Sequence, residues 1–178
     1  MAPAREERFE GLFRENYPAV RAYALRRTSP DAAQDVVAET FLVAWRRLDE
    51  VPADALPWLY GVARRVLANQ RRSASRGAAL EDRLAGATPR HPGRDPGDSA
   101  GDAELLRVAL GRLSETSREA LMLVAWQGLS GARAARAAGC SRAAFAVRLH
   151  RARTRLAAEL AALQPNTVSE VESVEVTS

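Results

Sequence analysis

Hydrophobic residues along this chain recur three and four positions apart, and this spacing predicts amphipathic helices. Three such patterns come first, at residues 5–27, 29–48 and 57–73, and the second starts with Ser29 as N-cap and Pro30 in the first turn. Two more cover residues 103–113 and 115–127. No alternating strand pattern and no long-period repeat appears, so we expect an all-α fold.

The last hydrophobic segment, residues 126–160, has a distinct pattern. It reads as a short helix, a turn at Ala138-Gly139-Cys140, and a second helix with an apolar stripe of Phe145, Leu149, Ala152 and Leu156. The other faces of that second helix are rich in arginine. A helix held by one apolar stripe and basic elsewhere is typical of a recognition helix in the DNA major groove, and the turn has helix-turn-helix spacing. A solvated basic helix, or one that meets an acidic partner protein, is the alternative.

A segment rich in proline and glycine separates the two groups of helices. It predicts a flexible linker, because it has no sustained apolar period. We therefore expect two small helical domains at 5–76 and 103–163, a linker at 77–102, and a disordered tail at 164–178.

Composition narrows the class of protein. The chain has 178 residues, of which 47% are hydrophobic, and this excludes global disorder. No apolar run is long enough to cross a membrane, and the N-terminal residues lack the apolar stretch of a signal peptide, so we expect a cytoplasmic protein without membrane contact. The single cysteine, Cys140, excludes an internal disulfide and a cysteine-rich zinc site. The histidines, His91 and His150, accompany no nucleophile or metal-binding carboxylates, so we expect neither enzymatic activity nor a cofactor.

The charge is unevenly distributed. All 26 basic residues are arginine, and the formal net charge is +4. Residues 107–160 contain ten arginines and three acidic residues, a net +7, as expected for a module that neutralises DNA phosphates.

Two carboxylates, Asp35 and Glu39, lie four residues apart on the second helix, away from its apolar stripe. They are either a solvated face, with Glu39 pairing with Arg46, or a docking surface for a basic partner protein.

The third helix combines basic, amide and aromatic side chains. Its arginines suit backbone phosphates, Asn69 could read a base edge, and Trp58 and Tyr60 are aromatic surfaces on which an unstacked base could stack. The polar candidates are Arg64, Arg65, Asn69, Arg71 and Arg72.

The order of these motifs resembles a known family. DAAQDVVAETFLVAWRRL, then PWLYGVARRVLANQRR, a linker, and LSETSREALMLVAWQGLS followed by AGCSRAAFAVRLHRARTRL resemble the extracytoplasmic-function (ECF) group of bacterial sigma factors over nearly all of residues 8–160. The resemblance implies an alternative sigma factor, whose partners are core RNA polymerase and promoter DNA. It leaves open whether an anti-sigma factor binds as well.

The resemblance also implies roles for individual residues. Asp35 and Glu39 would dock on the clamp helices of the largest polymerase subunit. Residues 49–56 and the third helix would capture and melt the minus-ten element, through Trp58, Arg64, Arg65, Asn69 and Arg72. The recognition helix would read the minus-thirty-five element through Arg142, Ala146, Val147, Arg148, His150 and Arg151.

The chain departs from the family pattern at several of these positions. Arg65 stands where the family usually has asparagine, and Asn69 replaces a frequent aspartate. In the first helix of the helix-turn-helix the usual "E-I-A-x-x-L-G" is residues 133–139, RAARAAG, so an arginine and alanines replace a glutamate and larger apolar residues. We expect these alanines to thin the core, since Leu→Ala changes cost about 2–5 kcal/mol. Two base-facing positions, Ala146 and Val147, are apolar. We therefore expect a promoter preference that differs from the common pattern of the group, or one that relies on thymine methyl contacts together with His150 and Arg151.

Two other functions remain open on the sequence alone. One is a helix-turn-helix regulator that acts without polymerase, although no dimerisation helix is apparent. The other is an enzyme that carries a helix-turn-helix, against which stands the absence of a catalytic cluster.

Overall fold

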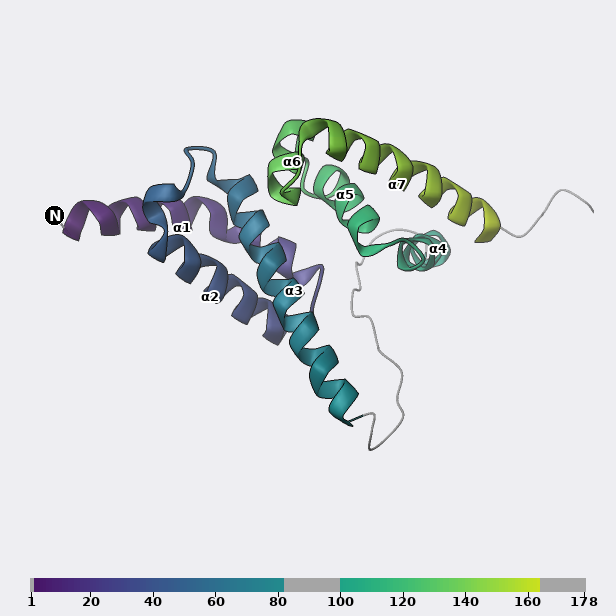
Figure 1. The fold of residues 1–178 in the computed structure, drawn as a ribbon, viewed down its shortest axis with the longest axis horizontal. Coiled ribbons are helices and arrows are strands. Elements are labelled where there is room, and N and C mark those ends of the chain that lie inside the picture. The colour runs from purple at the N-terminus through teal and green to yellow at the C-terminus, as the bar shows by residue number, and fades with distance from the viewer. Residues whose placement is uncertain (1, 82–99, 164–178) are drawn as a thin grey trace, which may run out of the picture.

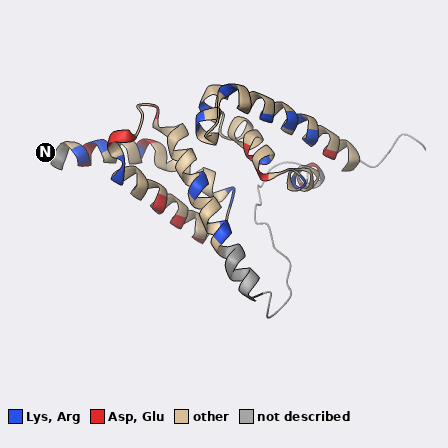
Figure 2. Cartoon of the chain, in the orientation of Figure 1, with Lys and Arg blue, Asp and Glu red and all other residues tan. Residues whose placement is uncertain are grey.

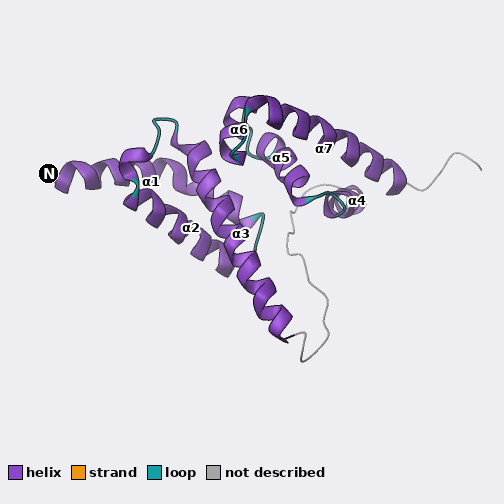
Figure 3. Ribbon diagram, in the orientation of Figure 1, coloured by secondary structure: helices purple, strands orange, loops and turns teal. Residues whose placement is uncertain are grey.

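A computed structural model describes residues 2–81 and 100–163, and within these ranges all regular secondary structure is helical (Figure 3). The α-helices are α1 (Ala2–Leu25), α2 (Pro30–Arg46), α3 (Ala55–Glu81), α4 (Ala100–Gly111), α5 (Glu115–Ala125), α6 (Gly131–Ala138) and α7 (Arg142–Leu163), with a short 3-10 helix at Leu48–Glu50. The expected all-α fold is confirmed. In the described ranges, no helix is both long and apolar enough to span a membrane.

Local sequence signals set several helix ends. Ser29 caps α2 by accepting a hydrogen bond from the Ala32 N–H at 3.4 Å, with Pro30 as the first helical residue. Ser114 caps α5 in the same way, accepting from the Ser117 N–H at 3.3 Å. Helix α3 runs eight residues beyond its expected end at 73, because no helix-breaking residue intervenes before Glu81 and Gly77 alone does not stop a helix.

The N-terminal half is a three-helix unit of α1, α2 and α3, which lie against one another (Figure 1). Its core is made of large side chains, among which Tyr23, Phe41 and Leu59 are each at most 3% exposed. The hydrophobic sides of α2 and α3 are buried, with Val37 on α2 and Val62 and Val66 on α3 each at most 5% exposed. Phe13 of α1 would be a core residue from the hydrophobic spacing of that helix, but it is 39% exposed, since it lies on the outer side of an aromatic row with Phe9 and Tyr17.

The C-terminal half, α4 to α7, buries large side chains such as Leu123, Leu129 and Phe145 together with several alanines. In α6 the four alanines at 134, 135, 137 and 138 are buried, and they belong to the same continuous core as the N-terminal half. Helix α6 packs against α3 as well as against α7 (Figure 1). The alanines expected to thin the core therefore lie where a neighbouring helix approaches closely.

The two expected domains are consequently in contact. Most of the expected linker, residues 82–99, and the whole tail, 164–178, lie outside the described residues. The ends of the linker, at 77–81 and 100–102, are helical, so α3 and α4 each extend into it.

Candidate nucleic-acid interface

The helix-turn-helix is formed by α6, a turn at Gly139-Cys140-Ser141, and α7. Gly139 ends α6 with a φ of +67°, a left-handed conformation that favours glycine. The Cys140 N–H donates to the Ala135 carbonyl at 3.1 Å. Ser141 then accepts from the Ala144 N–H at 3.1 Å, which starts α7. The turn thus fixes the direction in which α7 leaves α6.

Helix α7 has one buried side and one open side. Phe145 and Ala152 are 1% and 0% exposed, and Leu149 and Leu156 are half-buried, as the stripe predicted. Val147 is 51% exposed. The candidate minus-thirty-five residues are accessible except for a half-buried Arg148: they are Arg142, Ala146, Val147, His150 and Arg151. Basic residues recur along α6 and α7 (Figure 2).

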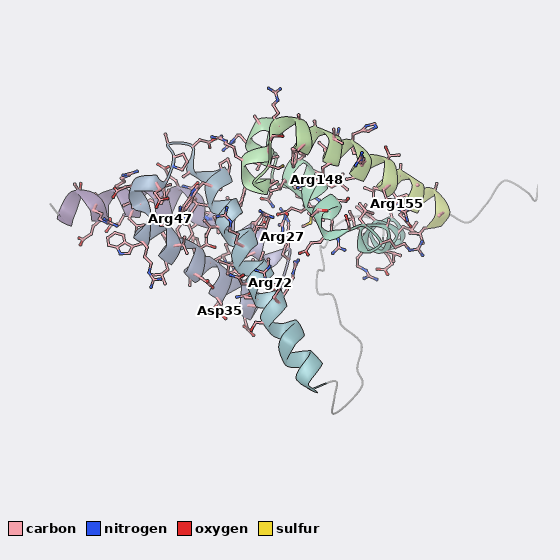
Figure 4. The ribbon with its side chains drawn as sticks, viewed as in Figure 1. Arg27, Asp35, Arg47, Arg72, Arg148 and Arg155 are labelled. Carbon is pink, nitrogen blue, oxygen red and sulfur yellow. The ribbon has the colours of Figure 1, made fainter. Side chains whose placement is uncertain are left out.

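The far end of α7 carries a feature that the sequence did not reveal. Glu159 is 8% exposed, and its carboxylate contacts Arg112, directly after α4, at 3.3 Å and Arg155 at 2.7 Å. Figure 4 shows Arg148 and Arg155 in sequence along α7. Arg155 therefore differs from Arg151, because an intramolecular carboxylate already offsets its charge.

Four candidate minus-ten residues share one strip of α3. Trp58, Arg65, Asn69 and Arg72 are spaced by seven, four and three residues, which places them on one side of a helix. Trp58 is half-buried and lies 5.8 Å from the Arg47 guanidinium, and the other three are exposed. Arg72 donates to the Asn69 side-chain oxygen, which orients the amide. The strip combines a ring, an amide and two cations.

Arg64 and Tyr60 lie off this strip. The Arg64 Nε is 3.9 Å from the Glu119 carboxylate of α5, and its side chain is 34% exposed. Tyr60 is 2% exposed; its ring stacks on Tyr23 at 4.8 Å, and its hydroxyl donates to Gln127 at 2.9 Å. Tyr60 is therefore not available for base stacking in this structure, contrary to expectation, because it fills the core between the two halves.

The α2 face that carries Asp35 and Glu39 is open. Both side chains are exposed, and neither makes an ion pair within the described residues, so the Glu39–Arg46 pair that one of the two alternatives included is not present there. Leu42, one turn further on, is 46% exposed. Figure 4 shows Asp35 on the outer edge of α2, away from α7.

Sequence reasoning missed the polar contacts between the halves. Asp54, in the segment before α3, accepts from Arg133 Nε at 3.1 Å and Arg133 Nη2 at 2.8 Å, and it also pairs with Arg136. Partial desolvation raises the pKa of Asp54, but hydrogen bonds and charges from these two arginines outweigh it and hold the pKa below its ordinary value. Arg133 and Arg136 lie 79 and 82 residues after Asp54 in the sequence, so no local pattern could have revealed these contacts.

A second contact centres on Glu119 of α5. Its carboxylate accepts from the buried Tyr23 hydroxyl at 3.0 Å, and burial raises the pKa of Tyr23 well above the usual range, so the phenol remains a donor. Arg71 of α3 pairs with Glu115, one turn before Glu119.

Among the described residues, no group of three His, Cys, Asp or Glu side chains is arranged to hold a metal ion.

Comparisons with known proteins agree with this geometry. Residues 12–77 match sigma-70 region 2, and residues 103–156 match sigma-70 region 4. The ECF RNA polymerase sigma factor SigL of Mycobacterium tuberculosis is 32% identical over 153 residues, which cover 84% of this chain and 86% of SigL. EcfG of Rhodopseudomonas palustris is 34% identical over 147 residues, covering 80% of each chain.

Solved structures give the same result. The sigma factor RpoE of Bartonella quintana, in complex with the anti-sigma factor NepR, superposes with a TM-score of 0.64 at 29% identity, covering 88% of this chain and 98% of RpoE. CnrH, in complex with the cytosolic domain of CnrY, gives a TM-score of 0.58 at 28% identity and covers 88% of this chain and 89% of CnrH.

The chain belongs to the ECF sigma factors of the bacterial RNA polymerase sigma-70 family. It is therefore an alternative sigma factor that binds core RNA polymerase, recognises promoters and starts transcription. The family consists of DNA-binding initiation factors that are not known enzymes. The comparisons do not support the alternative of a regulator that acts without polymerase.

Proposed function

We propose that this sigma factor docks on the polymerase through Asp35 and Glu39 of α2, captures the minus-ten element with the α3 strip, and reads the minus-thirty-five element with α7. The observation that carries the proposal is that these three groups, apart from half-buried Trp58 and Arg148, are exposed on three different helices, while the apolar stripe of each helix faces the core. The polymerase, the minus-ten element and the minus-thirty-five element can therefore each bind a separate group while the core stays folded.

The docking face combines unpaired negative charge with an apolar contact. Within the described part of the chain, neither Asp35 nor Glu39 is paired with a cationic side chain, and Leu42 extends the same side of α2 by about one turn. A basic partner surface with an apolar centre would meet all three. The clamp helices of the largest polymerase subunit, implied by the family resemblance, are the proposed partner.

The α3 strip suits a single strand that leaves the duplex. Trp58 offers a ring face for one base, Asn69 offers an amide for a base edge, and Arg65 and Arg72 offer charge for phosphates. Arg65 takes the position of the usual family asparagine, so Asn69 is the amide best placed to read a base here. Arg64 takes part only if the Glu119 contact opens.

Helix α7 reads the duplex partly through apolar contacts. Ala146 and Val147 can contact thymine methyl groups, and His150 and Arg151 follow about one turn later. Because Arg151 is exposed and makes no intramolecular ion pair within the described residues, it is free to reach a guanine edge. Arg155 forms an ion pair with Glu159, so its proposed role is limited to contacting a phosphate.

The partners and place of action follow from the same proposal. The two solved relatives are complexes, RpoE with the anti-sigma factor NepR and CnrH with CnrY, and we propose that an anti-sigma factor also binds this chain. The chain would act on cytoplasmic RNA polymerase.

The docking role is tested with Asp35→Arg combined with Glu39→Arg. We expect loss of core polymerase binding with unchanged helicity, because both residues lie off the buried stripe. The matched control is Glu6→Arg with Glu10→Arg on α1, which has the same spacing, exposure and change in charge. Binding to core polymerase is measured directly, and normal affinity of the Asp35/Glu39 variant would disprove the docking role.

Sequence readout is tested by comparing Arg151→Ala with Arg155→Ala on a promoter library. We expect Arg151→Ala to cost about 1–3 kcal/mol on the cognate promoter and to relax preference at one or two positions. Arg155→Ala should weaken all sequences about equally and by less, because its charge is already shared with Glu159. Unchanged base preference for Arg151→Ala would show that specificity comes from apolar contacts or DNA shape.

A further inference from the structure

The two halves of the chain are joined by ion pairs whose polarity reverses along the interface. Near the start of α3 the N-terminal half supplies the carboxylate, Asp54, and α6 supplies the cations, Arg133 and Arg136. Further along α3 the N-terminal half supplies Arg71, and α5 supplies Glu115. A surface with this reversed pattern accepts its partner in one register only, since sliding or turning either half brings like charges together.

The space between these two ends is closely packed. Gly61 of α3 faces α6 so closely that an added Cβ would lie 3.4 Å from the Ala137 carbonyl oxygen. Buried Tyr60 crosses from α3 to Gln127, and Tyr23 of α1 reaches Glu119 of α5. The contact therefore has a buried centre and charged ends, as in a specific protein interface.

The interface covers part of the proposed minus-ten machinery. Asp54 lies within residues 49–56, the segment assigned to minus-ten capture, and Arg64 of α3 is turned toward Glu119. The proposed minus-thirty-five face of α7 remains open, with Val147 51% exposed. Part of the proposed minus-ten machinery is thus engaged across the interface, whereas Arg65, Asn69 and Arg72 of the α3 strip stay exposed, like the α7 face.

We propose that Asp54 with Arg133 and Arg136 forms an autoinhibitory latch that holds the free sigma factor closed and keeps residues 49–56 from the minus-ten element. The inhibitory part of this inference rests on the proposed function of that segment. The latch is suited to release: its side chains are 37% to 53% exposed, and partly exposed ion pairs are weak and screened by salt. Arg133, which stands where the family usually has glutamate, supplies two of its hydrogen bonds.

The test measures the distance between the halves in the full-length protein. Spin labels are placed at the exposed Gln34→Cys on α2 and Ala157→Cys on α7, with Cys140→Ser to remove the native thiol. Double electron–electron resonance should give one narrow distance distribution for the otherwise unchanged chain, short in comparison with that of an opened variant. Asp54→Arg should remove that population and give longer, broader distances, because three arginines then meet.

The matched control is Asp49→Arg, an equal change in charge five residues earlier. Asp49 contacts Arg5 and Arg8 of α1, so the short distance should persist in this variant. Combining Asp54→Arg with Arg133→Asp and Arg136→Asp should restore the short distance. The latch is refuted if Asp54→Arg keeps the original distance, or if the unchanged chain shows no short population.

The inhibitory part has its own readout, the binding of free protein to single-stranded minus-ten DNA. Arg133→Asp combined with Arg136→Asp leaves residues 49–56 intact and should increase this binding several-fold. If the halves separate without such an increase, the latch exists but does not inhibit. If Asn69→Ala and Arg65→Ala then also leave binding unchanged, the minus-ten assignment itself is wrong, and the two failures are distinguished.

Discussion

The three-helix unit of α1 to α3 and the short helix α6 of the C-terminal half have interiors of different composition. The N-terminal half buries Tyr23, Phe41 and Leu59, whereas α6 in the C-terminal half buries a row of alanines. Large side chains provide most of the apolar area that stabilises a small domain, and alanines provide little. The comparison shows that the N-terminal half contains its own core, while α6 completes its packing by lying against α3.

Removing a large core side chain from the N-terminal half should have the largest effect. We expect Phe41→Ala to lower the free energy of unfolding by about 3–5 kcal/mol, because Phe41 is 3% exposed and central to the α1–α2 aromatic group. Urea unfolding followed by circular dichroism measures it. The neighbouring Leu42→Ala, at 46% exposure, is the control and should change stability little. Equal losses for the two variants would contradict this assignment of the core.

Enlarging the contact between the halves should have an intermediate effect. Gly61→Leu should push α6 away from α3 and cost about 1–3 kcal/mol, the usual penalty for overpacking. Gly61→Ala should be tolerated, because its Cβ would meet the Ala137 oxygen at ordinary contact distance. Thermal unfolding of both variants tests this, and a Gly61→Leu protein as stable as the parent would show that α6 does not depend on α3.

Acidification should have the smallest effect, confined to the charged end of the contact. The pKa of Asp54 is lowered in the closed form, so its contribution is complete above the ordinary carboxyl pKa of about 4 and is lost as the pH falls through the lowered value. The short inter-half distance should therefore become less populated as the pH drops below about 4. In the Asp54→Asn variant the short distance should be less populated at neutral pH, and its population should change less on acidification. An identical pH response in the variant and the parent protein would exclude Asp54 as the titrating group.

Sequence alone could predict the parts of this molecule that depend on local signals. Ser29 and Pro30 start α2 as expected, Gly139 ends α6, and the spacing of Phe145 and Ala152 gave the buried side of α7. These features follow from periodicity and from backbone requirements within a few residues of each site.

The contact between the halves could not be predicted in this way. Tyr60 has an aromatic ring on which a base could stack. Only its contacts with Tyr23 of α1 and Gln127 after α5 show that it is a core residue. From the sequence, the alanines of α6 predict a thin core. In the structure, α6 packs closely against α3, so these small side chains are buried. The roles of Asp35 and Glu39 remain predictions, since exposure is necessary for docking but does not identify the partner.

The absence of lysine bears on how the joint between the halves could be controlled in a cell. Every cation in it is an arginine, because the chain contains no lysine at all. A guanidinium keeps its charge across the physiological pH range, and lysine acetylation, which erases charge elsewhere, has no target here. The cationic side of the joint is therefore permanent, and closure responds only to whatever competes for its arginines or its carboxylates.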